Sequence, residues 1–177
     1  MIQLHNKTFE AFIASEEIDF AIKNMAKQME DDFQDEIPIF IGVLNGAFMV
    51  MADLMKHYSS LCEVSFVKMA SYQGTQTTNQ VKQLIGLNKN LEGRTVIIVE
   101  DIVDTGNTIE ELKAILKDKK VKHLKIATLF LKPDAYKKDI KLDYVGIRIP
   151  NKFIVGYGLD YDGLGRNLAG VYQLAEK

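Results

Sequence analysis

The chain has 177 residues, of which 47% are hydrophobic and 26% are charged, a balance typical of one globular domain with an apolar core. Its formal net charge of −2 argues against nucleic acid as a main partner, because binding to a phosphate backbone needs a basic face. One cysteine, an N-terminal segment without the apolar run of a signal peptide, and no apolar run near the ~18 residues of a membrane span predict a cytoplasmic protein with no membrane partner.

The N-terminal half alternates helical and strand patterns. Ser15 can cap a helix, because apolar residues recur after it at steps of three and four as far as Phe33. The continuously apolar segment Ile37–Leu44 predicts a strand buried on both faces. A helix at Ala47–Tyr58 and a strand at Val64–Ala70 follow.

The polar segment Tyr72–Gln83 is rich in Thr and Gln and predicts a loop or a hairpin. Beyond it, the patterns predict one helix and four strands before a glycine-rich tail. The helix is expected at Thr108–Leu116, and the strands at Arg94–Val99, His123–Leu131, Tyr144–Ile147 and Ile154–Tyr157.

Strands that alternate with helices imply crossover connections, so we expect an α/β fold with a mainly parallel central sheet flanked by helices. Ligands bind such sheets beyond the carboxyl ends of the strands. This rule directs attention to the residues that follow Leu44, Val99, Leu131 and Tyr157.

The most informative stretch is Val96–Thr108, with the sequence VIIVEDIVDTGNT. A buried strand leads into acidic residues, a glycine and the start of a helix. Gly106 permits a tight turn and a close approach of the backbone to a ligand. The free amides and positive dipole end of the helix, with the hydroxyls of Thr105 and Thr108, predict a phosphate-binding loop. It is not a Walker loop, since no lysine follows the glycine.

Three acidic residues, Glu100, Asp101 and Asp104, stand directly before this loop. A site for phosphate alone would avoid them, because like charges repel. They suit a ligand that also carries hydroxyl groups, or a divalent cation held by carboxylates, and a sugar phosphate meets both conditions. In the alternative interpretation, Asp104 only caps the helix and the other two acids are exposed.

This stretch resembles the signature of the type I phosphoribosyltransferases, which bind 5-phosphoribosyl-1-pyrophosphate (PRPP). The resemblance implies that Glu100 and Asp101 contact the ribose hydroxyls and help to hold Mg²⁺. It also implies that Asp104 is the general base towards an incoming purine. The residues implied to cradle the 5′-phosphate are Asp104, Thr105, Gly106, Asn107 and Thr108.

The C-terminal third, including YVGIRIPNKFIVGYGLDYDGLGRNL, resembles the hypoxanthine–guanine branch of this family. By this resemblance, Lys132 donates to the 6-oxygen of a purine, Phe153 stacks on the ring, and the backbone of Ile154 reaches the base edge. Asp160 lines the purine site and ligates Mg²⁺, and Arg166 contacts the pyrophosphate. Taken one by one, Lys132 also fits a solvated lysine, Phe153 a core aromatic, and Arg166 a surface charge.

Two upstream segments extend the resemblance. Gly42–Ala47 matches the pyrophosphate loop of the family, with a tight backbone after its third residue. The residues implied to bind there are Leu44, Asn45 and Gly46. Ser71 and Tyr72 match a lid that closes over the reaction. The human-type enzymes carry a lysine at the positions of Asn45 and Asn107, so these replacements remove positive charge near the phosphates.

We expect a single domain over residues 1–177, with a PRPP-binding core at 37–135 and a base-binding hood from 136–177 and part of the N-terminus. The resemblance implies PRPP and a 6-oxopurine, hypoxanthine or guanine, as substrates and Mg²⁺ as cofactor. It also implies a homo-oligomer, either a dimer or a tetramer.

Two other functions fit part of the pattern. A regulator that senses PRPP could keep the phosphate motif and lose the base site, but Lys132, Phe153 and Asp160 are present and no basic recognition helix is evident. The triplet Asp-Thr-Gly at 104–106 also occurs in aspartic proteases, but those are all-β, and the helical pattern after the triplet opposes that fold. The sequence therefore favours an enzyme that joins a phosphoribosyl group to a 6-oxopurine.

Overall fold

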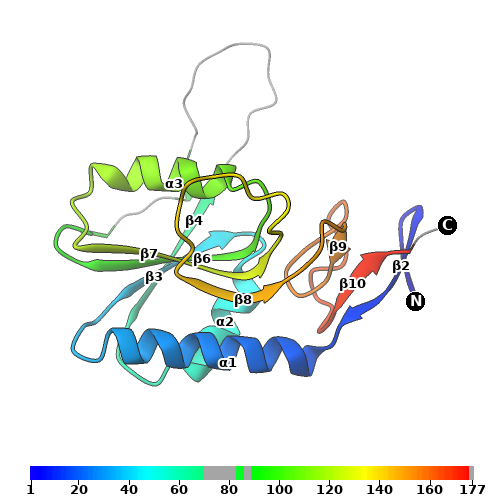
Figure 1. The fold of residues 1–177 in the computed structure, drawn as a ribbon, viewed down its shortest axis with the longest axis horizontal. Coiled ribbons are helices and arrows are strands. Elements are labelled where there is room, and N and C mark those ends of the chain that lie inside the picture. The colour runs from blue at the N-terminus through cyan, green and yellow to red at the C-terminus, as the bar shows by residue number, and fades with distance from the viewer. Residues whose placement is uncertain (70–82, 86–88, 176–177) are drawn as a thin grey trace, which may run out of the picture.

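The structure is a computed structural model, and it describes residues 1–69, 83–85 and 89–175. Its larger body holds a six-stranded sheet in the order β5-β4-β3-β6-β7-β8 (Figure 1). These strands are β3 (Ile39–Leu44), β4 (Glu63–Met69), β5 (Gln83–Ile85), β6 (Thr95–Val103), β7 (His123–Leu131) and β8 (Tyr144–Arg148). All neighbouring pairs are parallel except β4 and β5, which confirms the expected α/β fold.

Helices cover both faces of this sheet (Figure 1). On one face, α1 (Ser15–Asp32) and α2 (Phe48–His57) enclose an apolar core with Met25, Leu54 and Phe40 fully or almost fully buried. On the other face, α3 (Asn107–Lys117) packs Leu112 over Ile98 in a second core. Since the central strands are buried on both sides, their sequences are continuously apolar rather than alternating.

The two chain ends form a second sheet that the sequence patterns did not reveal. Its order is β1-β2-β10-β9, all antiparallel, and its strands are β1 (Ile2–Leu4), β2 (Lys7–Ile13), β9 (Ile154–Val155) and β10 (Val171–Leu174). Figure 1 shows both termini in this smaller lobe, beside the sheet body. The predicted glycine-rich tail therefore ends in a strand that pairs with the N-terminal hairpin.

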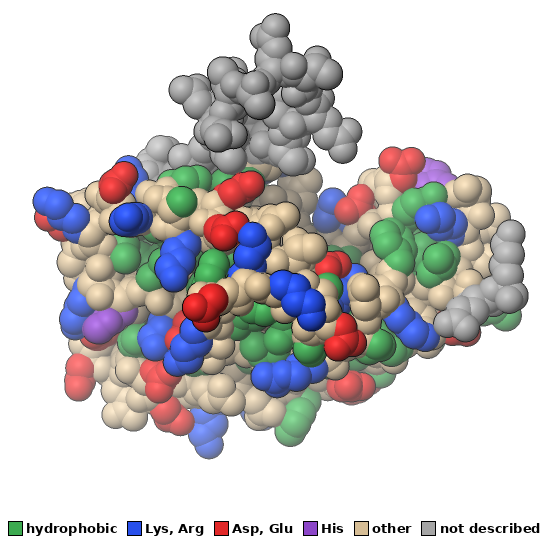
Figure 2. Space-filling view, turned by 45° about the horizontal axis from the view of Figure 1, so that its top comes forward, with side chains coloured by type: hydrophobic (Ala, Val, Ile, Leu, Met, Phe, Trp, Pro, Cys, Tyr) green, Lys and Arg blue, Asp and Glu red, His purple; other side chains and the backbone are tan. Residues whose placement is uncertain are grey.

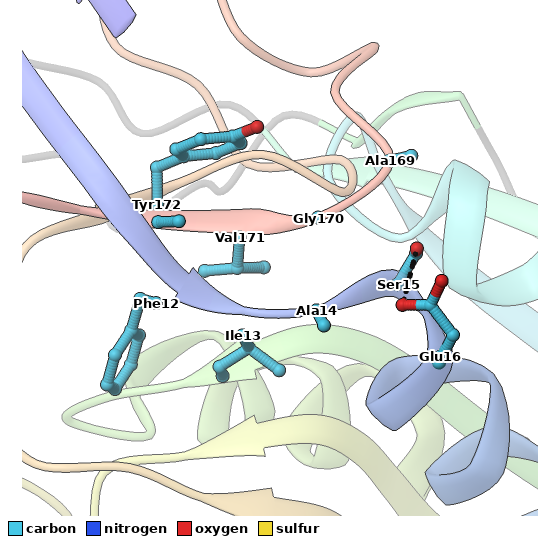
Figure 3. A pocket seen from close by; sticks show the side chains of 10 residues that line it. Phe12, Ile13, Ala14, Ser15, Glu16, Ala169, Gly170, Val171 and Tyr172 are labelled. Carbon is cyan, nitrogen blue, oxygen red and sulfur yellow. Dashed lines mark hydrogen bonds between the residues drawn. The ribbon is translucent and has the colours of Figure 1, made fainter. Parts of the chain in front are cut away.

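The junction between β2 and α1 corrects the expectation for Ser15. The helix N-cap is Ala14, without a side-chain hydrogen bond, and Ser15 is the first helical residue. Its hydroxyl donates instead to the carboxylate of Glu16 at 3.1 Å, the dashed line in Figure 3. Ile13 pairs with Val171 across the sheet at this junction, so tertiary pairing fixes where the helix begins.

Two other element boundaries differ from the patterns. The strand expected to end at Val99 continues to Val103, so Glu100 and Asp101 lie within β6. The strand expected at Ile154–Tyr157 is only two residues long, because the backbone turns at Tyr157 with φ of 48°.

Two further features concern the helices and the charges on the surface. None of the helices in the described part of the chain has the length and apolarity that crossing a membrane requires. Basic and acidic side chains are intermingled over the face seen in Figure 2. Several ion pairs join surface residues of opposite charge, such as Lys138 with Glu110 at 2.6 Å and Lys122 with Glu36 at 2.6 Å.

Candidate active site

Two adjacent parallel strands bring Asp104 and Lys132 together. Val103 and Leu131 are partners in the β6–β7 register, so the residue after each lies at the same edge of the sheet. Lys132 Nζ donates to Asp104 Oδ2 at 2.8 Å. The lysine side chain is only 10% exposed and the aspartate side chain 45% exposed, so the lysine is not a solvated surface residue.

Glu100 and Asp101 form a buried acidic pair at the end of β6, with 5% and 8% of their surfaces exposed. Burial raises the pKa of Asp101 to about 6, against the opposing effect of hydrogen bonds from backbone amides. Burial also raises the pKa of Glu100, and the neighbouring Asp101 adds to the shift. The alternative in which these acids are exposed is therefore wrong.

The turn between β6 and α3 follows Asp104. Gly106 is the helix N-cap with φ of 85°, and no side-chain hydrogen bond caps the helix, so Asp104 is not its cap. A Cβ on Gly106 would lie 2.5 Å from the ring of Tyr136, so both the backbone angle and the close packing require glycine. Asn107 and Thr108 open the helix, and their side chains are exposed.

Three segments meet tightly around Gly46. A Cβ there would lie 1.7 Å from Asp101 Oδ2, so only glycine lets this loop rest against the acidic pair. A Cβ on Gly158 would lie 2.1 Å from the carbonyl oxygen of Gly46. The peptide bond between Leu44 and Asn45 is cis, which agrees with the expected tight backbone at this position.

A cavity of about 470 Å³ opens beside these segments. The pyrophosphate-loop candidates, the acidic pair and the start of α3 all line it. The lining residues are Val43, Leu44, Gly46, Met69, Glu100, Asp101, Ile102, Asn107, Thr108 and Glu111. Residues of two predicted motifs, Gly42–Ala47 and Val96–Thr108, therefore share one cavity, whereas none of the C-terminal candidates lines it.

The C-terminal loop supplies a second ion pair. Arg166 donates to Asp160 Oδ1 at 2.5 Å and to the carbonyl oxygen of Gly158 at 2.6 Å. The charge of Arg166 lowers the pKa of Asp101 and the charge of Asp160 raises it, so this pair lies near Asp101. Phe153 is 45% exposed, so it is not a core aromatic, while Ile154 beside it is buried.

No group of three or more His, Cys, Asp or Glu side chains that could hold a metal ion occurs within the described residues. Mg²⁺ commonly needs only one or two carboxylates, with water and substrate phosphates as its other ligands. Glu100 and Asp101 line the cavity and supply such carboxylates. The donor set therefore fits Mg²⁺ held jointly with a phosphorylated substrate, and not a metal enclosed by protein ligands alone.

One predicted part of the site lies outside the described residues, and one described set of contacts was not predicted. Ser71 and Tyr72, predicted for a lid, lie outside the described residues. The sequence reasoning missed the contacts of the N-terminal residues His5, Asn6 and Lys7 with the loop after Asp160. No local motif marks these residues, because the contacts join positions more than 150 apart in the chain.

A family model described as the phosphoribosyl transferase domain matches residues 10–162. A hypoxanthine-guanine phosphoribosyltransferase of Streptococcus pyogenes serotype M3 is 46% identical over 156 residues, which cover 88% of this chain and 87% of that protein. The enzyme of the same name from Bacillus subtilis is 41% identical over 160 residues, or 90% of this chain and 89% of that one.

Solved structures agree with these sequence relatives. A crystal structure of a hypoxanthine-guanine phosphoribosyltransferase from Bacillus anthracis superposes with a TM-score of 0.88 at 37% identity, covering 96% of this chain and 100% of the other. A hypoxanthine phosphoribosyl transferase of Trypanosoma cruzi gives 0.87 at 32% identity, covering 98% and 95%. The expected type I phosphoribosyltransferase fold is thereby confirmed, and this chain belongs to the phosphoribosyl transferase family.

Proposed function

We propose that this protein transfers the phosphoribosyl group of PRPP to a 6-oxopurine, hypoxanthine or guanine, in purine salvage. The products are the nucleoside 5′-monophosphate and pyrophosphate. The observations that carry the proposal are the Lys132–Asp104 pair, 2.8 Å apart, and a cavity that the acidic pair and the start of α3 line. The names of the relatives support the same activity.

The proposed base site uses the two charges in opposite ways. A lysine ammonium can only donate, so Lys132 suits a purine 6-oxygen and does not suit the amino group of adenine. A carboxylate can accept, so Asp104 suits the proton on the purine ring nitrogen that attacks the ribose. The exposed ring of Phe153 offers a stacking surface, and the backbone of Ile154 offers hydrogen-bonding groups for the base edge. The purine would insert between the partners of the present ion pair.

The proposed PRPP site lies in the cavity. The amides at the start of α3, with the side chains of Thr105, Asn107 and Thr108, would bind the 5′-phosphate near the positive end of the helix dipole. Glu100 and Asp101 would accept hydrogen bonds from the ribose hydroxyls. The loop of Leu44, Asn45 and Gly46 and the guanidinium of Arg166 would bind the pyrophosphate.

The acidic residues also suggest where Mg²⁺ binds. We assign its protein ligands to Glu100, Asp101 and Asp160. When bound, the ion would neutralise negative charge on the departing pyrophosphate. Asp160 now accepts from Arg166, so binding of the metal complex of PRPP would require these two side chains to separate and to face the pyrophosphate and the ion.

We extend the proposal to the arrangement of the chain. Residues 37–135 would bind PRPP, and the sheet of the chain ends, with residues 136–177, would form a hood over the base. Ser71 and Tyr72 would close over the reaction, which would exclude water as a competing nucleophile. The active form would be a homo-oligomer, a dimer or a tetramer.

The decisive experiment measures product formation from PRPP and Mg²⁺ with hypoxanthine, guanine, xanthine and adenine in turn. We expect hypoxanthine or guanine to react at least about 10⁴-fold better than adenine, because adenine leaves a buried donor without its acceptor. Equal turnover of adenine and hypoxanthine would refute the role of Lys132. Tight PRPP binding without turnover of any base would instead indicate a PRPP sensor.

A further inference from the structure

Lys7 lies where the N-terminal hairpin approaches the base-binding end of the chain. Its Nζ stands over the ring of Phe153 at 5.2 Å from the centroid and over the ring of Tyr161 at 4.5 Å. These two rings meet edge to face, with centroids 5.9 Å apart and planes at 88°. Within the described part of the chain no ion pair joins Lys7 to a carboxylate, so its charge is directed at the two rings.

The turn before Lys7 contacts the same loop. His5 Nε2 lies 3.1 Å from the carbonyl oxygen of Asp162, and the His5 ring meets Tyr161 edge-on at 5.7 Å. The hydroxyl of Tyr161 donates to Asn6 Oδ1 at 2.9 Å. Three consecutive residues of the hairpin therefore hold the loop that directly follows Asp160. In Figure 2, basic side chains lie among hydrophobic ones on the lobe that the chain ends form.

Besides Lys7 and Tyr161, Phe153 has one aromatic neighbour among the described residues. The residue is 45% exposed, and the ring centroid of its aromatic neighbour on β2, Phe9, lies 6.2 Å from that of Phe153 with a tilted geometry. A ring that is nearly half exposed can rotate about its side-chain bonds unless contacts hold it. A cation over the ring face supplies such a contact, because the electron-rich face attracts positive charge.

We propose that Lys7 is a positioning residue for the purine: it fixes the rings of Phe153 and Tyr161, so the N-terminal hairpin sets the affinity for the base. This inference rests on the proposed function, in which Phe153 stacks on the purine. The two rings that Lys7 contacts are not among the groups assigned to PRPP or to proton transfer. Its loss should therefore change base binding and leave the chemical step intact.

The test compares Lys7→Met, which removes the charge and keeps an unbranched side chain, with Lys7→Arg, which keeps a cation able to contact aromatic rings. KM for hypoxanthine, KM for PRPP and kcat are measured for each variant. We expect Lys7→Met to raise KM for hypoxanthine about three- to tenfold, the effect of losing contacts with two rings. KM for PRPP and kcat should stay within about twofold, and Lys7→Arg should restore the hypoxanthine KM.

Phe153→Leu, alone and combined with Lys7→Met, tests whether Lys7 acts through the ring of Phe153. Phe153→Leu should raise KM for hypoxanthine, and Lys7→Met should then add less than it does in the wild type, because the two residues act as one unit. If Phe153→Leu raises this KM but Lys7→Met does not, Lys7 is not a positioning residue and the proposed function stands. If Phe153→Leu leaves it unchanged, the proposed stacking role fails, and the inference fails with it. Equal rises in both KM values, or a lower hypoxanthine KM in Lys7→Met, would also overturn the inference.

Discussion

At the scale of single residues, the candidate site holds two ion pairs. In the proposed reaction, one would contact the base and the other the pyrophosphate. Lys132 and Asp104 pair with each other at 2.8 Å, as Arg166 and Asp160 do at 2.5 Å. Substrate binding would exchange these internal contacts for contacts with the base and the pyrophosphate.

Replacing Asp104 by Asn tests the proposed general base. The amide oxygen can still accept from Lys132, but the side chain can no longer take a proton. General base catalysis contributes about 10²–10⁴-fold, so kcat should fall by at least about 10² while PRPP affinity changes little. Thr108→Val is the matched variant, and it should chiefly weaken PRPP binding. A near-normal kcat for the Asn variant, with folding checked by circular dichroism, would move the base elsewhere.

Asp101 predicts a pH-dependent stability. Burial raises the pKa of Asp101 from its ordinary value of 3.8 to about 6, so between these values the folded protein keeps a proton that the unfolded chain loses. The carboxyl therefore lowers stability as the pH rises towards about 6, by on the order of 3 kcal/mol above it. Asp101→Asn should raise Tm by at least about 3 °C at pH 8 and by much less at pH 4.

Asp53→Asn is the control, because its expected change in Tm at pH 8 has the opposite sign. Burial opposes ionisation of Asp53, but hydrogen bonds from Lys56 and Tyr157 outweigh it and lower the pKa. A lowered pKa stabilises the fold above the ordinary value, so this variant should lower Tm at pH 8. If Asp101→Asn also lowers Tm at pH 8, the buried carboxylate is not a source of instability.

At the scale of elements, the candidate site contains loops that pack closely against each other, and glycine stands at the points of contact. Gly46 rests on Asp101 at the end of β6, and Gly158 of the C-terminal loop rests on the carbonyl oxygen of Gly46. The strands deliver these loops to one edge of the sheet. The absence of Cβ atoms then lets the Gly46 loop pack against Asp101 and the Gly158 loop pack against the Gly46 loop.

Gly158→Ala separates this close approach from backbone strain. Gly158 has φ of 96°, and an added Cβ would lie 2.1 Å from the Gly46 oxygen, so the loops must move apart. Gly93 has φ of 70° with no atom within 4 Å of such a Cβ, so Gly93→Ala carries only the backbone cost of about 1–2 kcal/mol. We expect Gly158→Ala to lower Tm further and to lose most of its kcat. Equal Tm values and a retained kcat would show that the contact is dispensable.

At the scale of the whole molecule, the site combines the middle of the chain with both ends. The six-stranded sheet supplies the acidic pair and leads into the turn proposed to bind phosphate, and the four-stranded sheet of the chain ends carries Ile154 and the N-terminal hairpin. Because Asp160 follows the small sheet and Glu100 lies in the large one, a shared metal complex would link the two bodies.

Removal of divalent cations tests that link. EDTA should abolish turnover and added Mg²⁺ should restore it, because Mg²⁺ can be held by a few carboxylates together with substrate phosphates. The measurement is the initial rate with PRPP and hypoxanthine at increasing free Mg²⁺. A full rate in the presence of the chelator would remove Glu100, Asp101 and Asp160 from any metal role. Asp160→Asn should raise the Mg²⁺ concentration needed for half-maximal rate.

The sequence by itself determined the central sheet and singled out the local motifs of the candidate site. Continuous apolar runs such as Ile37–Leu44 predict buried parallel strands, and a strand–acid–glycine–helix order predicts a phosphate loop, because both signals are local in the chain. The contact of Asp104 with Lys132, in contrast, depends on the pairing of β6 with β7 and on its register, which the sequence did not predict.

Only the tertiary structure decided the features that depend on distant contacts. Strands β1, β9 and β10 have three, two and four residues, too few to show a period. Pairing between Ile13 and Val171, rather than a capping side chain, determines where α1 begins. The burial of Glu100 and Asp101 follows from the loops packed over them, which no spacing encodes. The contact of Lys7 with Phe153 joins the first strands to the last, so folding alone creates it.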